Sequence, residues 1–149
     1  MNVAQVCNRE VIVVNRDASI LKACQLMRQY HVGALLVVDE RDGQRYPAGI
    51  MTDRDIVVEL LAEELPLERI SIGDAMSFEL LTADENDDLL VTIKRMRTRG
   101  VRRAPVVSAD GSLVGLLAVD DLIELLAEQL TDLVTLIANE QSRERVLRS

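Results

Sequence analysis

The segment Thr52-Asp53-Arg54-Asp55 places a hydroxyl, two carboxylates and a guanidinium directly after residues 49–51. Residues 49–51 predict a strand and the residues after the segment predict a helix, so the polar groups lie at a strand-to-helix junction. The unpaired N–H groups and partial positive charge of a helix amino terminus suit a phosphate, and a carboxylate can accept both hydroxyls of a ribose. Thr52 and Asp55 could therefore hold a nucleotide. The alternative is that Thr52 or Asp53 only caps the helix.

Arg102 and Arg103 are the most basic local feature on the strand side of an acidic chain. They precede Pro105, which predicts the start or the edge of a strand. Two adjacent guanidinium groups can neutralise phosphate oxygens through forked N–H donors. The competing interpretation is a pair of solvated arginines in surface ion pairs. Successive strand residues point to opposite faces, so the sequence does not say which cleft either arginine would serve.

The residues that could catalyse a reaction are not arranged for one. His31, the single histidine, is predicted to end a helix and has no Ser or Asp at a triad spacing. Carboxylate pairs such as Asp120-Asp121 lack the separated environments that an acid and a base need. Cys7 and Cys24 stand alone and indicate buried thiols in a reducing compartment. We expect neither an enzyme nor a metal site.

The composition excludes further classes of protein. The chain has 149 residues, 48% of them hydrophobic, and a chain of this length can bury a core without disulfides. Its 17 basic and 25 acidic residues give a net charge of -8, which repels nucleic-acid backbones and anionic lipid. The longest apolar run, residues 34–38, is too short to span a bilayer, and the amino terminus does not read as a signal peptide. We therefore expect a cytoplasmic globular protein that binds neither nucleic acid nor membrane.

The elements that position the candidate residues occur twice. The apolar positions of one predicted helix recur sixty-nine residues later, and the strands around it recur in the same order. The first copy is predicted as strand 11–14, helix 20–30, strand 34–38, turn 42–43, strand 49–51 and a helix from about 55. Its counterparts are strand 80–83, helix 89–99, strand 103–107, turn 110–111, strand 115–117 and a helix from about 121.

Two such β-α-β-β-α copies predict an α/β protein in which two pseudo-symmetric repeats pack as one module, followed by an extended C-terminal helix. The expected boundaries are 1–65 for the first repeat, 66–79 for a connection, 80–130 for the second repeat and 131–149 for the helix extension.

The repeat resembles the CBS-domain pair, also called a Bateman module. The resemblance rests on residues 32–39 with 49–55 in the first half and residues 101–107 with 115–121 in the second. It covers nearly the whole chain, and two ordered copies with matched spacing make chance agreement improbable. The resemblance implies a cleft for an adenosine-containing ligand such as AMP, ADP, ATP or S-adenosylmethionine. It also implies assembly into homodimers.

The resemblance assigns the ribose-binding carboxylate to Asp55 and implies two unequal sites. The site built on Asp55 keeps both expected hydroxyls, Thr52 from its own repeat and Thr82 from the other. The site built on Asp121 has Ala118 and Val13 in their places, so we expect it to be weakened. Thr82 could also be only a strand residue, and Asp121 only a helix cap. The predicted ligand-binding residues are Ile50, Thr52, Asp55, Thr82, Arg102, Arg103 and Asp121.

The last predicted helix is longer than the repeat requires and carries an apolar stripe. The stripe consists of Leu122, Leu126, Leu130, Leu133 and Ile137, at spacings of three and four. A dimer contact is the preferred interpretation, and packing within the chain is the alternative. The leading functional hypothesis is a stand-alone regulatory module that senses an adenine nucleotide and signals to an unidentified partner. The alternative is a structural dimerisation module without a ligand.

Overall fold

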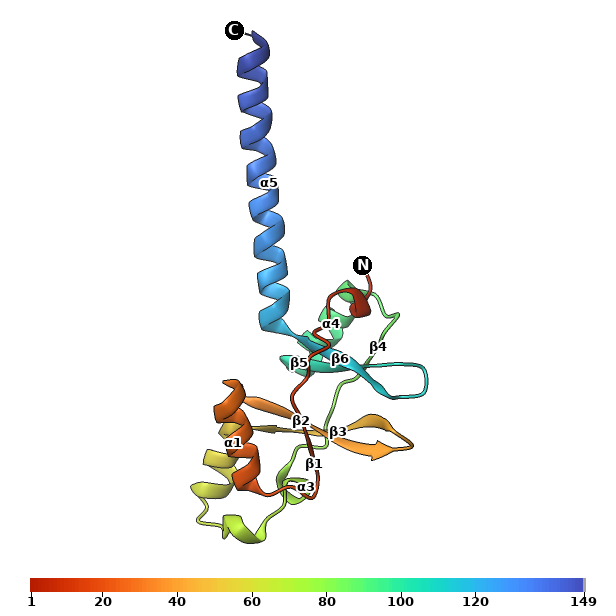
Figure 1. Cartoon of the computed structure of the whole chain (residues 1–149), viewed down its shortest axis with the longest axis vertical. Coiled ribbons are helices and arrows are strands. Elements are labelled where there is room, and N and C mark those ends of the chain that lie inside the picture. The colour runs from red at the N-terminus through yellow and green to blue at the C-terminus, as the bar shows by residue number, and fades with distance from the viewer. Residues whose placement is uncertain (149) are drawn as a thin grey trace. The chain divides into compact units, whose positions relative to one another are not determined.

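The computed structural model describes residues 1–148, which form two compact units, one from Met1 to Leu117 and one from Ala118 onward. The first half contains β1 (Val13–Asn15), α1 (Ile20–Tyr30), β2 (Ala34–Arg41), β3 (Gln44–Thr52) and α2 (Asp53–Asp55), which continues into η2 (Ile56–Leu61) (Figure 1). The second half contains β4 (Ala83–Asp84), α4 (Leu89–Arg99), β5 (Arg103–Val107), β6 (Leu113–Ala118) and α5 (Val119–Arg148). The predicted α/β class, the two β-α-β-β-α repeats and the long C-terminal helix are confirmed.

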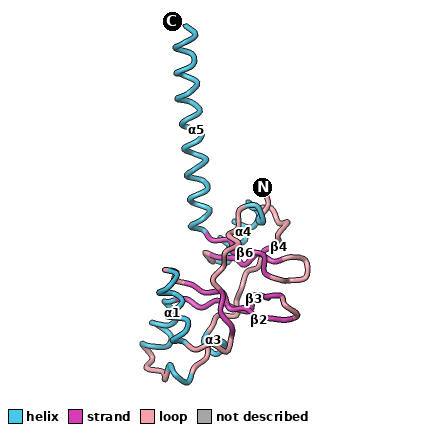
Figure 2. The backbone as a smooth tube through the Cα atoms, in the orientation of Figure 1, coloured by secondary structure: helices cyan, strands magenta, loops and turns pink. Residues whose placement is uncertain are grey.

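Each repeat forms its own three-stranded sheet, in the orders β1-β2-β3 and β4-β5-β6 (Figure 2). In the first sheet β1 runs parallel to β2, which requires the crossover helix α1, and β2 pairs with β3 as a hairpin. Residues 35–38 of β2 are all buried, as a central strand covered on both faces requires. Ile20, Leu35 and Met51 are among the most deeply buried residues of this half.

The helix ends follow local chemistry that is visible in the sequence. The Ser19 hydroxyl accepts a hydrogen bond from the Lys22 amide at 3.0 Å and caps α1. His31 ends α1 in the left-handed conformation, with φ of 54°, and its amide donates to the Met27 carbonyl. The prediction that His31 is a helix-end residue is therefore confirmed.

Short backbone segments pass from each half to the sheet of the other. Asn8, which precedes β1, exchanges two hydrogen bonds with Leu116 of β6, at 2.9 and 2.8 Å. Ser77, which precedes β4, exchanges two with Ile50 of β3, both at 3.0 Å. Figure 1 shows the amino-terminal segment running from the second sheet to β1. The two sheets are therefore completed reciprocally.

The exchange extends to the short helices that open the two segments, η1 (Val3–Gln5) and α3 (Ile72–Ala75). Val3 donates to the Asp87 carbonyl, and sixty-nine residues later Ile72 donates to the Ala18 carbonyl, both at 2.9 Å. Val3 and Ile72 are both fully buried. Residues 66–79, expected as a connection, thus include the counterpart of the amino-terminal segment, together with η3 (Leu67–Arg69).

Gly49 and Gly115 occupy equivalent places beneath the exchanged segments. A Cβ on Gly115 would lie 2.7 Å from the Asn8 carbonyl oxygen, and a Cβ on Gly49 would lie 2.6 Å from the Ser77 carbonyl oxygen. Both distances are far inside van der Waals contact, and the opposing atoms belong to the backbone. Only glycine at these two positions allows the segments to approach.

Most strand predictions differ from the structure in extent, and only the strand at 103–107 matches at both ends. The strand predicted at 80–83 is the two-residue β4, and residues 80–82 precede it. The strand predicted at 34–38 continues to Arg41. Pro105, predicted to start or edge a strand, lies inside the central strand β5. On the β4 side only Val106 and Val107 are paired, so no hydrogen bond to β4 requires an N–H group at Pro105.

We expect Gly115→Ala to lower the free energy of unfolding by about 1–3 kcal/mol, because the new methyl group would push the amino-terminal segment off β6. Gly49→Ala should behave alike. Gly33→Ala is the matched control, since its Cβ would meet only the Asp53 carboxylate at 3.2 Å, the mobile end of a side chain, and should cost about 0.5 kcal/mol or less. Urea denaturation measures all three variants. Unchanged stability of Gly115→Ala would contradict this account of the exchange.

Candidate functional site

Thr52 and Asp55 cap the helix that follows β3 and satisfy each other. The Asp55 amide donates to Oγ1 of Thr52 at 3.0 Å, and the Thr52 amide donates to Oδ2 of Asp55 at 3.2 Å. The arrangement is a capping box, in which two otherwise unpaired amides of the helix start are satisfied. Of the two capping candidates, Thr52 is confirmed. Asp53 is the wrong one, since its carboxylate accepts instead from the neighbouring Arg54 amide at 2.8 Å.

The capping box leaves polar capacity unused. No described residue donates to Oδ1 of Asp55, and the Thr52 hydroxyl proton is not spent on the box, in which its oxygen acts only as an acceptor. Both side chains are half-buried. Asp55 can therefore accept a hydrogen bond from a bound molecule, and Thr52 can donate one to it, without breaking the helix cap.

The helix carrying Asp55 departs from α geometry immediately afterwards. The Ala62 amide donates to the Val57 carbonyl at 2.9 Å and the Leu65 amide to the Leu60 carbonyl at 3.1 Å, both spanning five residues as in a π-helix. A shallow hollow of about 310 Å³ lies over this helix, lined by Asp53, Arg54, Val57 and Val58. Thr52 and Asp55 do not line this hollow.

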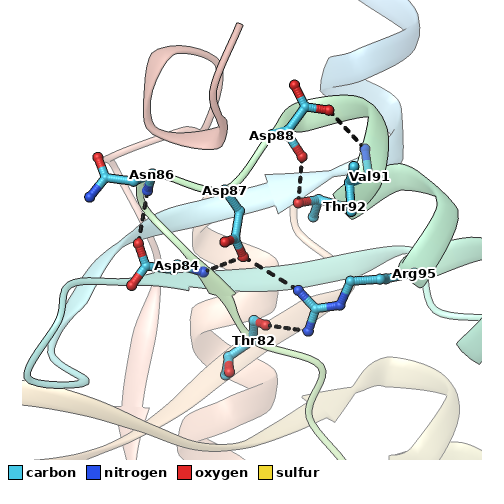
Figure 3. Close-up of polar contacts among 8 residues, drawn as sticks. All are labelled: Thr82, Asp84, Asn86, Asp87, Asp88, Val91, Thr92 and Arg95. Carbon is cyan, nitrogen blue, oxygen red and sulfur yellow. Dashed lines mark hydrogen bonds and ion pairs between the residues drawn. The ribbon is translucent and has the colours of Figure 1, made fainter.

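Thr82 lies just before β4 and is anchored through its backbone by a residue that the sequence did not indicate. Arg95 of α4 donates through Nη2 to the Thr82 carbonyl at 3.2 Å and lies 3.4 Å from Oδ2 of Asp87 (Figure 3). The same Asp87 oxygen accepts from the Asp84 amide at 3.0 Å. Arg95 thus links the residues before β4 to α4 through the Thr82 carbonyl, and the exposed Thr82 hydroxyl takes no part in this bond. No sequence spacing signals a contact that spans thirteen residues.

The bridge between Ile50 and Ser77 relates the predicted residues of the two halves. Ile50 is two residues before Thr52, whereas Ser77 is five residues before Thr82, which leads into β4 of the other sheet. Ile50 contributes both backbone groups to this bridge, and its side chain is half-buried.

The other predicted site residues lie elsewhere in the chain. Arg103 begins β5 and is half-buried, whereas Arg102 is exposed in front of the strand. Asp121 lies in the first turn of α5 and belongs to the second unit. Val13 opens β1 and Ala118 closes β6, so the residues expected in place of the two hydroxyls of the second site are strand-end residues.

The carboxylates with shifted pKa values stabilise local structure away from these residues. Arg16 donates to Asp39 at 2.7 and 3.0 Å and holds the pKa of that carboxyl below its ordinary value. Hydrogen bonds from Ser108 and Ser112 lower the pKa of Asp110 to about 2 in the turn between β5 and β6. These pKa shifts mark a strand-end ion pair and a hairpin turn.

Neither a metal cluster nor a membrane span is found within the described part of the chain. Residues 1–148 contain no group of three or more His, Cys, Asp or Glu side chains placed to hold a metal ion. None of their helices is both long and apolar enough to cross a bilayer. Cys7 and Cys24 are free and half-buried, and burial raises the pKa of the Cys7 thiol.

The sequence profile of the CBS domain matches residues 3–62 and 72–128. The chain belongs to the CBS domain family. The two matched segments begin sixty-nine residues apart, at the two short helices that open the exchanged segments. Each match to the CBS domain therefore begins with the segment that pairs with the other half of the chain.

Relatives and solved structures agree with this assignment. The CBS domain-containing protein YhcV of Bacillus subtilis is 33% identical over 113 residues, 76% of each chain. The uncharacterized protein MK0525 of Methanopyrus kandleri is 27% identical over 125 residues, 84% of this chain, which spans only 62% of the relative's length. The CBS domain pair of protein MJ0100, solved with 5'-methylthioadenosine and S-adenosyl-L-methionine, has the same fold, with a TM-score of 0.73, 22% identity, and coverage of 87% of this chain and 98% of that one.

Replacing Thr52 by Val should lower the free energy of unfolding by about 1 kcal/mol, because the Asp55 amide loses its acceptor. Asp53→Ala removes a carboxylate that does not cap the helix and should change stability by about 0.5 kcal/mol or less. Urea denaturation followed by circular dichroism compares the two. If Asp53→Ala costs as much as Thr52→Val, the capping assignment is wrong.

Proposed function

We propose that this CBS pair is a regulatory module that binds one adenosine-containing ligand per chain, an adenine nucleotide such as AMP, ADP or ATP, at Asp55. The observation that carries the proposal is the unused hydrogen-bonding capacity of the capping box. Oδ1 of Asp55 is available to accept from a ribose hydroxyl, and the Thr52 hydroxyl is available to donate. We assign no catalytic step to the module.

The helix start at Asp53 supplies the electrostatic part of the proposal. A helix amino terminus carries partial positive charge, which suits the phosphates of a nucleotide. Arg102 and Arg103 are the proposed phosphate partners from the second repeat, since a guanidinium offers forked donors to phosphate oxygens. Thr82, with its exposed hydroxyl, is the proposed contact next to them. The ligands of the MJ0100 pair, which shares the fold, support the adenosine class.

The two repeats are proposed to differ in affinity. Asp121 has Ala118 where the first repeat has Thr52, so the equivalent of the capping box hydroxyl is missing. Val13 stands where the other site has Thr82. A ribose at Asp121 would find the carboxylate without its neighbouring hydroxyls, and each missing hydrogen bond weakens binding.

The module is proposed to act as a homodimer in the cytoplasm and to signal to a partner that remains unidentified. A second candidate function, a structural dimerisation module without ligand, is favoured by one observation. Thr52 and Asp55 already satisfy each other through the capping box and serve the fold without any ligand. Binding measurements separate the two functions, because the structural module gains no stability from nucleotide.

Asp55→Ala should weaken binding of the adenine nucleotide by about tenfold to a few hundredfold, because a hydrogen bond to a charged acceptor contributes roughly 1.5–3 kcal/mol. Asp55→Asn is the matched variant, since its amide oxygen can still accept from the Thr52 amide while an NH2 donor replaces Oδ1, so it should weaken binding without breaking the helix cap. Asp121→Ala should change the affinity much less. Thermal-shift screening against AMP, ADP, ATP, NADH and S-adenosylmethionine selects the ligand, and calorimetry measures the variants. Normal binding by folded Asp55→Ala would refute the ribose assignment.

Titration calorimetry of the unmodified chain should find about one strong site per chain, because only the Asp55 side keeps both hydroxyls. Restoring the first hydroxyl with Ala118→Thr should raise the affinity of the second site. Two equal sites in the unmodified chain would contradict the proposed asymmetry, and the absence of heat with every nucleotide would favour the structural module.

A further inference from the structure

The helix α5 is 30 residues long and carries more exposed apolar surface than any other described element. At 1.5 Å per residue its axis spans about 45 Å. Isolated helices are marginally stable in water, and most helical stability in proteins comes from packing an apolar face. An apolar face that remains exposed along such a helix therefore indicates a missing partner.

Five of the exposed apolar side chains of α5 form one continuous seam, which begins at Ile123 because Leu122, the first residue of the predicted stripe, is buried. Their successive spacings are three, four, three and four residues, the heptad pattern that keeps side chains on one line of a helix facing another helix. Each seam side chain is between 54% and 64% exposed. The seam consists of Ile123, Leu126, Leu130, Leu133 and Ile137.

The positions that flank the seam carry no charge over its length. In a helix pair the flanking side chains lie beside the partner helix, so charges there select or reject partners. The flanking residues are Ala127, Gln129, Val134, Leu136 and Gln141, together with Leu122, which is buried within the chain. A seam with neutral and partly apolar flanks is suited to another seam of the same kind and offers nothing to a strongly charged partner.

Charge is distributed unevenly along α5. Residues 119–134 contain five carboxylates and no Lys or Arg, whereas residues 135–148 contain three arginines and two glutamates. Two such helices side by side in parallel would align acidic half with acidic half. In an antiparallel pair each acidic half lies toward the basic end of the other, which is electrostatically favourable.

The basic end gives a second argument against a parallel pair. Arg143 and Arg148 occupy flanking positions five residues apart, and flanking residues at that spacing meet across a parallel two-stranded coiled coil. A parallel pair would thus bring like charges together twice, although Arg148 is already paired within its own helix with Glu144 at 2.6 Å. An antiparallel pair separates these arginines.

We propose that the α5 seam pairs with the seam of a second copy of this chain in antiparallel orientation. The proposal deepens the homodimer of the proposed function by naming the surface and its direction, and it does not depend on ligand binding at Asp55. The five seam side chains, at alternating spacings of three and four, provide the knobs-into-holes packing that a helix pair needs.

Spin labels on α5 test the surface and the direction together. The full chain, with Cys7 and Cys24 replaced by Ala, carries a single cysteine at position 124 or 145 through Glu124→Cys or Arg145→Cys. For a pair centred between Leu130 and Leu133, which places Asp120 opposite Arg143 of the partner helix, pulsed electron resonance should give about 25 Å between labels at position 124 and about 40 Å between labels at position 145, from the helical rise. A parallel pair would give a short distance at both positions and would overturn the proposal.

Variants at the seam centre separate pairing from other contacts of the chain. Leu130→Asp should abolish the short distance at position 124, whereas Glu128→Gln, on the opposite face of the helix, should leave it unchanged. If Leu130→Asp lowers the helical content in circular dichroism, Leu130→Ala serves instead, because Ala keeps the helix propensity and should still weaken the pair. A short distance that survives both Leu130 variants, or no distance in the parent chain, would overturn the proposal. Nucleotide calorimetry on the same variants reports the proposed ligand site separately.

Discussion

The rest of the first unit depends on a reciprocal exchange of backbone hydrogen bonds. The segment before β1 completes the sheet of the second half, and the segment before β4 completes that of the first. Neither sheet pairs all of its backbone without the other half of the chain, and buried unpaired backbone groups are costly. The packing of Val3 and Ile72 and the glycines beneath the segments follow from this exchange.

Periodicity and caps predicted the helices well. The ranges expected for α1 and α4 match the structure at both ends, because an apolar stripe marks the buried face; the structure shows Ser19 and Asp88 as their caps. Strands were predicted less well, since β4 is only two residues long and leaves no alternation to detect. The exchange itself could not be predicted, because Asn8 and Ser77 pair through backbone atoms that every sequence contains.

The candidate site shows the same division. The sequence predicted that Thr52 and Asp55 lie at a strand-to-helix junction, where they could bind a ligand or Thr52 could cap the helix. The structure shows their side chains in a capping box at this junction. Arg95 was not predicted, because its bond to the Thr82 carbonyl depends on how α4 packs beside β4. The structure also shows that Asp55 serves the fold before any ligand is considered, so one carboxylate links helix stability to the proposed chemistry.

The matched exchange bears on how such a chain can arise. Several bonds that the first segment makes to the second half have counterparts that the second segment makes to the first half, as Val3 to Asp87 has in Ile72 to Ala18, sixty-nine residues apart. This is the pattern of a domain-swapped dimer of two single repeats, in which each subunit gives its first segment to the other. Fusion of the two subunits by gene duplication would retain every swapped contact and make it intramolecular. The pseudo-symmetry of the chain is therefore the symmetry that such a dimer would have, and a single chain, unlike a dimer of identical repeats, allows Asp121 and its neighbours to differ from Asp55 and its neighbours.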